Sequence, residues 1–319
     1  MEISQGIKII FIGTPEFGAI VLEGLIKNDL RPVLVITAPD KPVGRKQILT
    51  PSSVKVIAEK YNVPVSQIVN LKNSTSVNLL SKEKPDLIIV AAYGQILPKE
   101  ILDIPKYGCL NIHPSLLPKY RGPSPIQATI LNDETEIGVS IIKMVSRVDA
   151  GPIVAKSKIQ IPKSKITYLE LHDELADLGA RLLVKTIPDW LEGKIKPAPQ
   201  DEARATYTKI LTRQDGKIDW KKPAEYIERQ IGAFNPEPGT FCLVNGKVLK
   251  IIKAGIQEQT KAGPFGSPGK TYLATNDKIA CQTGKNFLII EELQLEGKKP
   301  TAASAFIKGH KDFIGTVLN

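Results

Sequence analysis

The sequence predicts an α/β protein with two domains: a mostly parallel sheet flanked by helices, then a smaller β-barrel. Three observations support this prediction. The first part of the chain alternates short apolar runs with amphipathic stretches, which is typical of parallel strands joined by crossover helices. A polar segment rich in Lys and Pro follows near residue 200. Beyond it, short β-type segments are separated by Gly and Pro turns.

The first domain begins with an apolar strand over 7–12 that ends at Gly13. This glycine permits a tight turn into a helix over 17–27, as in a Rossmann-like fold. The segment 13–18 lacks the second glycine of the G-x-G-x-x-G pattern, so it indicates fold and no dinucleotide site. A hydride-transferring enzyme is therefore disfavoured. The remaining elements expected in this domain are a strand over 31–37, a helix over 53–61, and strands over 85–94 and 108–112.

The domain boundary is expected after an amphipathic helix over about 168–190. Residues 192–209 are polar and carry two prolines, Pro197 and Pro199, which is typical of an exposed linker. We therefore expect a catalytic domain over 1–191 and a second domain over 210–319. The second domain should contain a helix over 223–231 and strands over 240–244, 248–254, 278–282 and 287–295.

Composition limits the class of protein. The 319 residues, 42% of them hydrophobic, suffice for two cores. We expect neither a membrane span nor a signal peptide, and hence a cytoplasmic protein, because no apolar run reaches eighteen residues and no basic segment precedes an apolar one at the start. Cys109, Cys242 and Cys281 lack metal-ligand spacing, which predicts buried thiols and no metal site.

The net charge of +10 is shared equally between residues 1–200 and the shorter 201–319, so the C-terminal part is more basic per residue. A basic surface attracts phosphate backbones without reading their sequence. A solvated lysine-rich surface would look the same, so charge alone does not predict nucleic-acid binding.

Asn111, His113 and Asp149 form the candidate catalytic group. The first two are two positions apart on an expected strand and therefore share one face. An amide can donate to a tetrahedral oxyanion, and a histidine beside a carboxylate can accept a proton near neutral pH. Together they suit acyl transfer to an amine. Taken singly, such a histidine near a Pro-rich turn and such an Asp-Ala-Gly triplet are more often structural turn residues than catalytic ones.

The amino-acid sequence of this region resembles that of a known protein family. Residues 111–118, with Lys119, Tyr120, Arg121 and Gly122 after them, closely resemble the signature of the formyltetrahydrofolate-dependent formyltransferases. The segments 10–18, 39–45, 92–98 and 233–236 are similar, in order and spacing, to the members that act on methionyl-tRNA. The similarity thus extends over nearly the whole chain.

The resemblance implies a co-substrate, 10-formyltetrahydrofolate, and an acceptor, the α-amine of methionyl initiator tRNA. In this interpretation Asn111 holds the formyl oxygen, and His113 or a water held by Asp149 accepts the amine proton. Asp149 orients His113 and favours its charge. The folate contacts that the resemblance implies are Tyr93, Gly94, Ile96, Leu97, Ser115, Leu116, Leu117 and Pro118.

The resemblance also implies how tRNA is bound. A loop over 37–50 would enter the acceptor stem and contact it through Arg45, with Lys41 and Lys46 beside it. Lys209 and Arg213 are further candidates for tRNA contact. The second domain would be an OB-like barrel, a fold that commonly holds nucleic acid. Without the resemblance, these cations would be interpreted as an ordinary mobile loop and a solvated face. A monomer is expected.

Two rival enzymes share the predicted chemistry. A glycinamide-ribonucleotide formyltransferase would not need the residues after the linker. A formyltransferase for an amino sugar nucleotide is the closer alternative, since it can carry a C-terminal extension, but the basic C-terminal part and the Arg45 loop favour tRNA. A binding protein without turnover would be expected to lack Asn111, His113 or Asp149, and all three are present.

Overall fold

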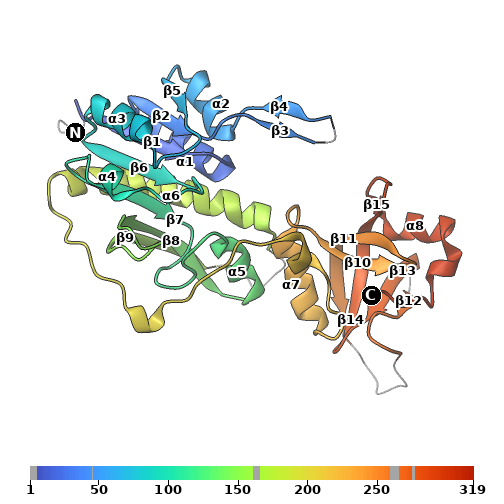
Figure 1. Cartoon of the computed structure of the whole chain (residues 1–319). Coiled ribbons are helices and arrows are strands. Elements are labelled where there is room, and N and C mark those ends of the chain that lie inside the picture. Colours follow the sequence, from blue (N-terminus) through green and yellow to red (C-terminus); the bar gives the residue numbers. More distant parts are fainter. Residues whose placement is uncertain (1–5, 45, 161–165, 259–265, 275–276) are drawn as a thin grey trace. The chain divides into compact units, whose positions relative to one another are not determined.

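The computed structural model describes residues 6–44, 46–160, 166–258, 266–274 and 277–319 (Figure 1). Among them, contacts divide the chain into two compact units. The first unit comprises Met1–Pro125, Glu136–Gln160 and Leu169–Lys209. The second comprises Ile126–Thr135, Ile161–Tyr168 and Ile210–Asn319, so the helix α5 (Pro125–Leu131) lies almost wholly in the second unit.

The first unit is built on a seven-stranded sheet in the order β5-β2-β1-β6-β7-β8-β9. The first five strands in this order pair in parallel, and β8 pairs antiparallel with both of its neighbours, β7 and β9. Their bounds are β1 Ile9–Gly13, β2 Leu34–Thr37, β5 Val65–Gln67, β6 Leu87–Ala91, β7 Cys109–His113, β8 Glu136–Lys143 and β9 Ile153–Gln160. The helices are α1 Glu16–Ile26, α2 Ser53–Lys60, α3 Ser74–Glu83, α4 Lys99–Leu102 and α6 Tyr168–Leu191, with a 3-10 turn over Glu202–Arg204.

The strands β1, β2 and β6 show why this sheet is mainly parallel. Each is a run of apolar, largely β-branched residues that is buried along its whole length. A strand with two buried faces requires cover on both sides, which the crossover helices of a parallel sheet provide. The prediction of a mostly parallel α/β sheet is confirmed.

The segment 37–50, predicted as a loop, contains a hairpin. Strand β3 (Lys41–Val43) pairs antiparallel with β4 (Ile48–Thr50). The sequence favours this pairing because Val43, Ile48 and Leu49 have the apolar character of strand residues, and Gly44 adopts a positive φ of 71° at the turn. Arg45 lies outside the described residues.

The second unit is an antiparallel sheet in the order β10-β11-β14-β13-β12, with β15 paired to β14. The strands are β10 Thr240–Val244, β11 Lys247–Gln257, β12 Thr271–Ala274, β13 Lys278–Gln282, β14 Phe287–Leu295 and β15 Thr301–Ala302. The helices are α7 Ala224–Phe234 and α8 Ala303–Gly309, with 3-10 turns over Arg213–Gly216 and Lys311–Phe313. Strands β12 and β15 were not predicted, because so few residues show no clear alternation.

The C-terminal tail closes this sheet into a barrel. On one side, Leu318 donates its backbone N–H to Gly269 at 2.9 Å and Thr271 donates to Thr316 at 2.9 Å. On the other side, Asn319 and Leu243 exchange both backbone hydrogen bonds, at 3.0 and 2.6 Å. The tail therefore bonds to the edge beside β12 and to the edge strand β10, and the predicted small barrel is confirmed.

Two general features complete the fold. The three cysteines are free and buried, as predicted, and burial raises the pKa of Cys109 and of Cys242 to about 12. None of the helices in the described ranges is long and apolar enough to span a membrane. No group of three or more His, Cys, Asp or Glu side chains suited to a metal ion occurs among the same residues.

The role of the tail can be tested at Leu318, whose side chain is 1% exposed within the barrel core. We expect Leu318→Ala to lower the free energy of unfolding of the second unit by about 2–5 kcal/mol, the usual cost of truncating a buried leucine. Urea unfolding followed by tryptophan fluorescence would measure this, because Trp220 lies in the same core. Val317→Ala is the matched control, since the neighbouring Val317 is 42% exposed. Equal stability of the two variants would contradict closure by the tail.

Candidate active site

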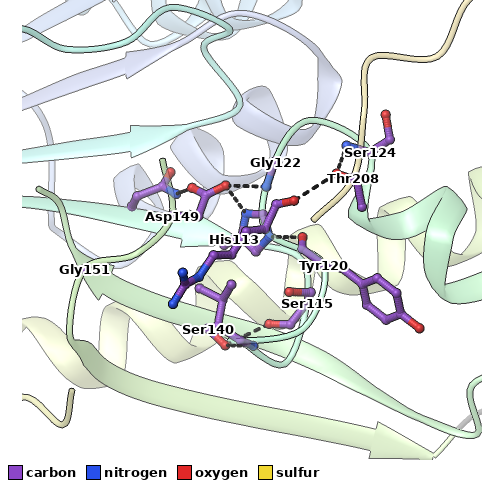
Figure 2. A network of polar contacts seen from close by, with 12 residues as sticks. His113, Ser115, Tyr120, Gly122, Ser124, Ser140, Asp149, Gly151 and Thr208 are labelled. Carbon is purple, nitrogen blue, oxygen red and sulfur yellow. Dashed lines mark hydrogen bonds and ion pairs between the residues drawn. The ribbon is translucent and has the colours of Figure 1, made fainter. Parts of the chain in front are cut away.

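The structure brings together the three residues predicted to be catalytic. Figure 2 shows two of them, His113 and Asp149, beside each other. Asn111 and His113 lie on β7, and Asp149 follows β8 in the turn before β9. The Nδ2 atom of Asn111 donates to Oδ1 of Asp149 at 3.4 Å. Nδ1 of His113 lies 3.6 Å from Oδ2 of the same carboxylate. The two-residue spacing on the strand therefore directs both side chains toward one carboxylate.

The orientation of the His113 ring is fixed from its other side. Its Nε2 lies 2.9 Å from the backbone carbonyl oxygen of Tyr120. A carbonyl oxygen can only accept, so Nε2–H is the donor in this hydrogen bond. The basic nitrogen of the neutral ring is then Nδ1, which faces Asp149 at a distance longer than a hydrogen bond. His113 is thus held by Tyr120 and influenced by Asp149 through its charge.

Asp149 is itself anchored by the loop after β7. The backbone N–H of Gly122 donates to Oδ2 of Asp149 at 2.7 Å. Gly122 has a φ of 104°, and a Cβ there would lie 2.8 Å from the carbonyl oxygen of Thr208. A side chain at position 122 would therefore be strained and crowded. The signature glycine allows the backbone to approach Asp149 closely.

A buried arginine ties this loop to the segment after α6. Arg121 is fully buried and pairs with Glu202 at 2.9 Å. Backbone hydrogen bonds join Arg121 to Thr206 and to Thr208, at 2.9 and 2.7 Å. Arg121, and after it Arg147, lowers the pKa of the Glu202 carboxyl to about 2. The segment predicted to be an exposed linker therefore also supports the candidate site.

Sequence reasoning did not identify Gln200 and Glu202. Both lie in the polar stretch 192–209, whose composition is that of a linker. Their partners are about fifty or more residues away in the chain. The signature that contains Arg121 was the only signal for this region, and it does not identify the partners of that arginine 79 and 81 positions further along the chain.

The predicted folate residues divide into two groups by burial. Tyr93, Leu97, Ser115 and Leu117 are buried. The hydroxyl of Ser115 donates to the carbonyl oxygen of Lys119 at 2.7 Å, and burial raises the pKa of Tyr93 to about 12. The more accessible members are Gly94, Ile96, Leu116 and Pro118.

Ser140 fixes the turn that carries Ser115, Leu116, Leu117 and Pro118. Its hydroxyl donates to the carbonyl oxygen of Ser115 at 2.8 Å and accepts from the backbone N–H of Leu117 at 3.0 Å. Ser140 is fully buried on β8. One hydroxyl thereby satisfies two backbone groups at the centre of the motif, which would otherwise be costly to bury.

The predicted tRNA residues are scattered over both units. Lys41 and Lys46 are exposed on the β3–β4 hairpin, as Lys209 is in the first unit and Arg213 in the second. The guanidinium of Arg213 lies 5.6 Å from the ring centre of Phe241.

Comparison with known proteins gives the family. The chain matches the family model described as formyl transferase over residues 7–187, and that described as formyl transferase, C-terminal domain, over 210–311. It is 41% identical to the methionyl-tRNA formyltransferase of Citrifermentans bemidjiense, over 98% of this chain and 96% of the relative.

Solved structures share the fold at low identity. HypX from Aquifex aeolicus in complex with tetrahydrofolic acid has a TM-score of 0.66 and 17% identity, over 97% of this chain. This chain spans 48% of the length of HypX. The N-formyltransferase from Helicobacter canadensis, in complex with folinic acid and dTDP-3-aminofucose, has a TM-score of 0.62 and 21% identity, over 89% of this chain and 98% of that one.

These comparisons confirm the resemblance found in the motifs. The identity to sugar N-formyltransferases supports a common fold alone, whereas the identity to the methionyl-tRNA enzymes is about twice as high. The chain belongs to the formyl transferase family and, within it, to the methionyl-tRNA formyltransferases.

Proposed function

We propose that the protein transfers the formyl group of 10-formyltetrahydrofolate to the α-amino group of methionyl initiator tRNA. The observation that carries this proposal is the convergence of Asn111, His113 and Asp149 at the end of β7. These groups suit amine acylation, and the relatives that match the whole chain are methionyl-tRNA formyltransferases by name. The product, N-formylmethionyl-tRNA, would serve translation initiation.

The proposed chemistry begins with attack of the amine nitrogen on the formyl carbon. A carbon–nitrogen bond forms and the formyl oxygen acquires negative charge. Asn111 would stabilise this oxyanion, because an amide has two N–H donors and only one is directed at Asp149. Collapse of the intermediate breaks the bond between the formyl carbon and N10 of the folate, which then takes up a proton.

His113 would manage the proton of the attacking amine. Its Nε2–H is occupied by the carbonyl of Tyr120, so Nδ1 is the atom that would accept the proton. The positive charge formed on the ring would be stabilised by the carboxylate of Asp149, 3.6 Å away. Nδ1 faces the carboxylate of Asp149, and the same carboxylate accepts a hydrogen bond from Asn111.

Folate would bind the loops after β6 and β7. We propose direct contact by the accessible residues Gly94, Ile96, Leu116 and Pro118. The buried Tyr93, Leu97, Ser115 and Leu117 would act by holding the backbone of these loops.

The tRNA acceptor stem would meet the β3–β4 hairpin. Lys41 and Lys46 are exposed there, and Arg45 lies between them in the chain. Lys209 and Arg213 are further proposed phosphate contacts. We also propose that the protein acts as a monomer, which sedimentation would test, and in the cytoplasm, where tRNA is charged.

The acceptor can be identified with a panel of substrates. We expect formylation of methionyl initiator tRNA with 10-formyltetrahydrofolate as donor, and little or none of methionyl elongator tRNA, glycinamide ribonucleotide or an amino sugar nucleotide. Transfer of labelled formyl groups at equal acceptor concentrations would measure this. A preference for the amino sugar nucleotide would keep the chemistry and refute the tRNA assignment.

The role of Asn111 can be tested by Asn111→Ala. Loss of an oxyanion donor should lower the single-turnover rate by about 10²-fold or more. Asn28→Ala is a suitable control, because Asn28 is an exposed asparagine just after α1 whose Nδ2 donates to the carbonyl oxygen of Gly24. A near-normal rate in the Asn111 variant would show that another group stabilises the oxyanion.

The role of the β3–β4 hairpin in tRNA binding can be tested by removing its charged side chains. Arg45→Ala and the double variant Lys41→Ala/Lys46→Ala should weaken tRNA binding and reduce its dependence on salt concentration, by about one unit of the log–log slope for each phosphate that the variant no longer neutralises. Filter binding over a salt series would measure both quantities. The control is Lys72→Ala, an exposed lysine of the same unit. Unchanged affinity and slope would remove the hairpin from the tRNA site.

A further inference from the structure

Gln200 makes an unusual set of contacts for a residue in a segment of linker composition. Its Nε2 donates to the backbone carbonyl oxygens of Asp149 and Gly151, each at 2.7 Å. Its Oε1 accepts from Nε and Nη2 of Arg121, at 3.1 and 2.9 Å. The whole amide of Gln200 is therefore engaged by the turn that carries Asp149 and by the buried arginine of the loop that anchors Asp149.

Arg121 determines which way the Gln200 amide faces. A guanidinium has only donors, so the atom of Gln200 that meets Arg121 must be the oxygen. The NH₂ group must then point at the two carbonyl oxygens, which can only accept. In the reverse orientation the NH₂ group of Gln200 would face the N–H donors of Arg121, and its oxygen would face the two carbonyl oxygens. The amide thus has one orientation compatible with its surroundings.

The turn at 149–151 has an uncommon and closely packed backbone. Asp149 has a φ of 49°, in the left-handed region that few residues with a side chain adopt, although aspartate does so more readily than most. Gly151 is packed so closely that a Cβ would lie 1.9 Å from the carbonyl oxygen of Lys143. The two hydrogen bonds from Gln200 span this turn and fix the backbone from which the Asp149 carboxylate extends.

From these contacts we infer that Gln200 is a positioning residue of the formyl-transfer site. It holds the Asp149 turn so that the carboxylate meets Asn111 and His113, and Arg121 in turn holds Gln200. The inference rests on the proposed function. It assigns a role in the reaction to a residue outside the catalytic sheet, on the segment that follows α6.

The first test compares Gln200→Ala and Gln200→Glu with the wild-type chain. Both variants remove the two N–H donors, and the glutamate also places a carboxylate oxygen against two carbonyl oxygens. We expect kcat to fall by about tenfold to a hundredfold, because displacement of a catalytic group by about an ångström costs this much. KM for the folate donor and for methionyl-tRNA should change by less than about threefold. Lys196→Ala, an exposed position four residues earlier, is the matched control and should retain wild-type kcat.

The second test separates positioning from loss of stability. If Gln200 acts through Asp149, then adding Gln200→Ala to an Asp149→Asn variant should lower the single-turnover rate by less than about twofold further, since coupled residues are not additive. Thermal unfolding of each variant ensures that rates are compared well below its midpoint. Multiplicative losses, or a fall in rate matched by loss of folded protein, would overturn the inference.

The outcome also separates this inference from the proposed function. A wild-type chain that formylates no acceptor would overturn the proposed function, and the inference with it. A wild-type chain that formylates methionyl-tRNA beside a Gln200→Ala variant of equal kcat would overturn the inference alone.

Discussion

The complete pairing of the Arg121 guanidinium is the interaction on which the candidate site depends. An arginine has five N–H donors, and this fully buried one directs them to the side chains of Gln200, Glu202 and Tyr207 through five hydrogen bonds of 2.9–3.2 Å. A buried charge without such partners would be strongly destabilising. The loop after β7 is thereby fixed to the segment after α6, and Gly122 and Tyr120, on either side of Arg121, contact Asp149 and His113.

Elements whose conformation follows from the pattern of neighbouring residues were predictable from the sequence. The buried strands β1 and β6 are recognisable as apolar runs, and the alternation of a strand placed Asn111 and His113 on one face. The hairpin β3–β4 was missed because its proline and cations resemble a loop. Both faces of its strands are also exposed, so their apolar residues do not alternate with polar ones as they would on a half-buried strand.

Features that depend on loop geometry or on contacts between distant positions could not be predicted. The ring of His113 is oriented by the carbonyl of Tyr120, a residue with a φ of 61° that no local pattern revealed. Gln200 meets Asp149 across 51 positions of chain. The motif around Ser115 indicated a binding loop, but a motif does not separate side chains that touch a ligand from those that hold the backbone. Burial of Ser115 and Leu117 supports our proposal that these two hold the backbone of the loop.

The geometry of Asp149 explains why one carboxylate can serve two partners. Oδ1 accepts from Asn111, while Oδ2 accepts from the backbone of Gly122 and faces Nδ1 of His113. Both oxygens are therefore restrained, and neither can turn toward one partner without leaving the other. In the proposed reaction, a carboxylate held in this way would need no reorganisation as charge develops on His113, which is the condition under which fixed electrostatics lower a barrier most. The backbone at Asp149 sets the position of this negative charge. Restraint of that backbone therefore matters as much as the choice of an aspartate side chain.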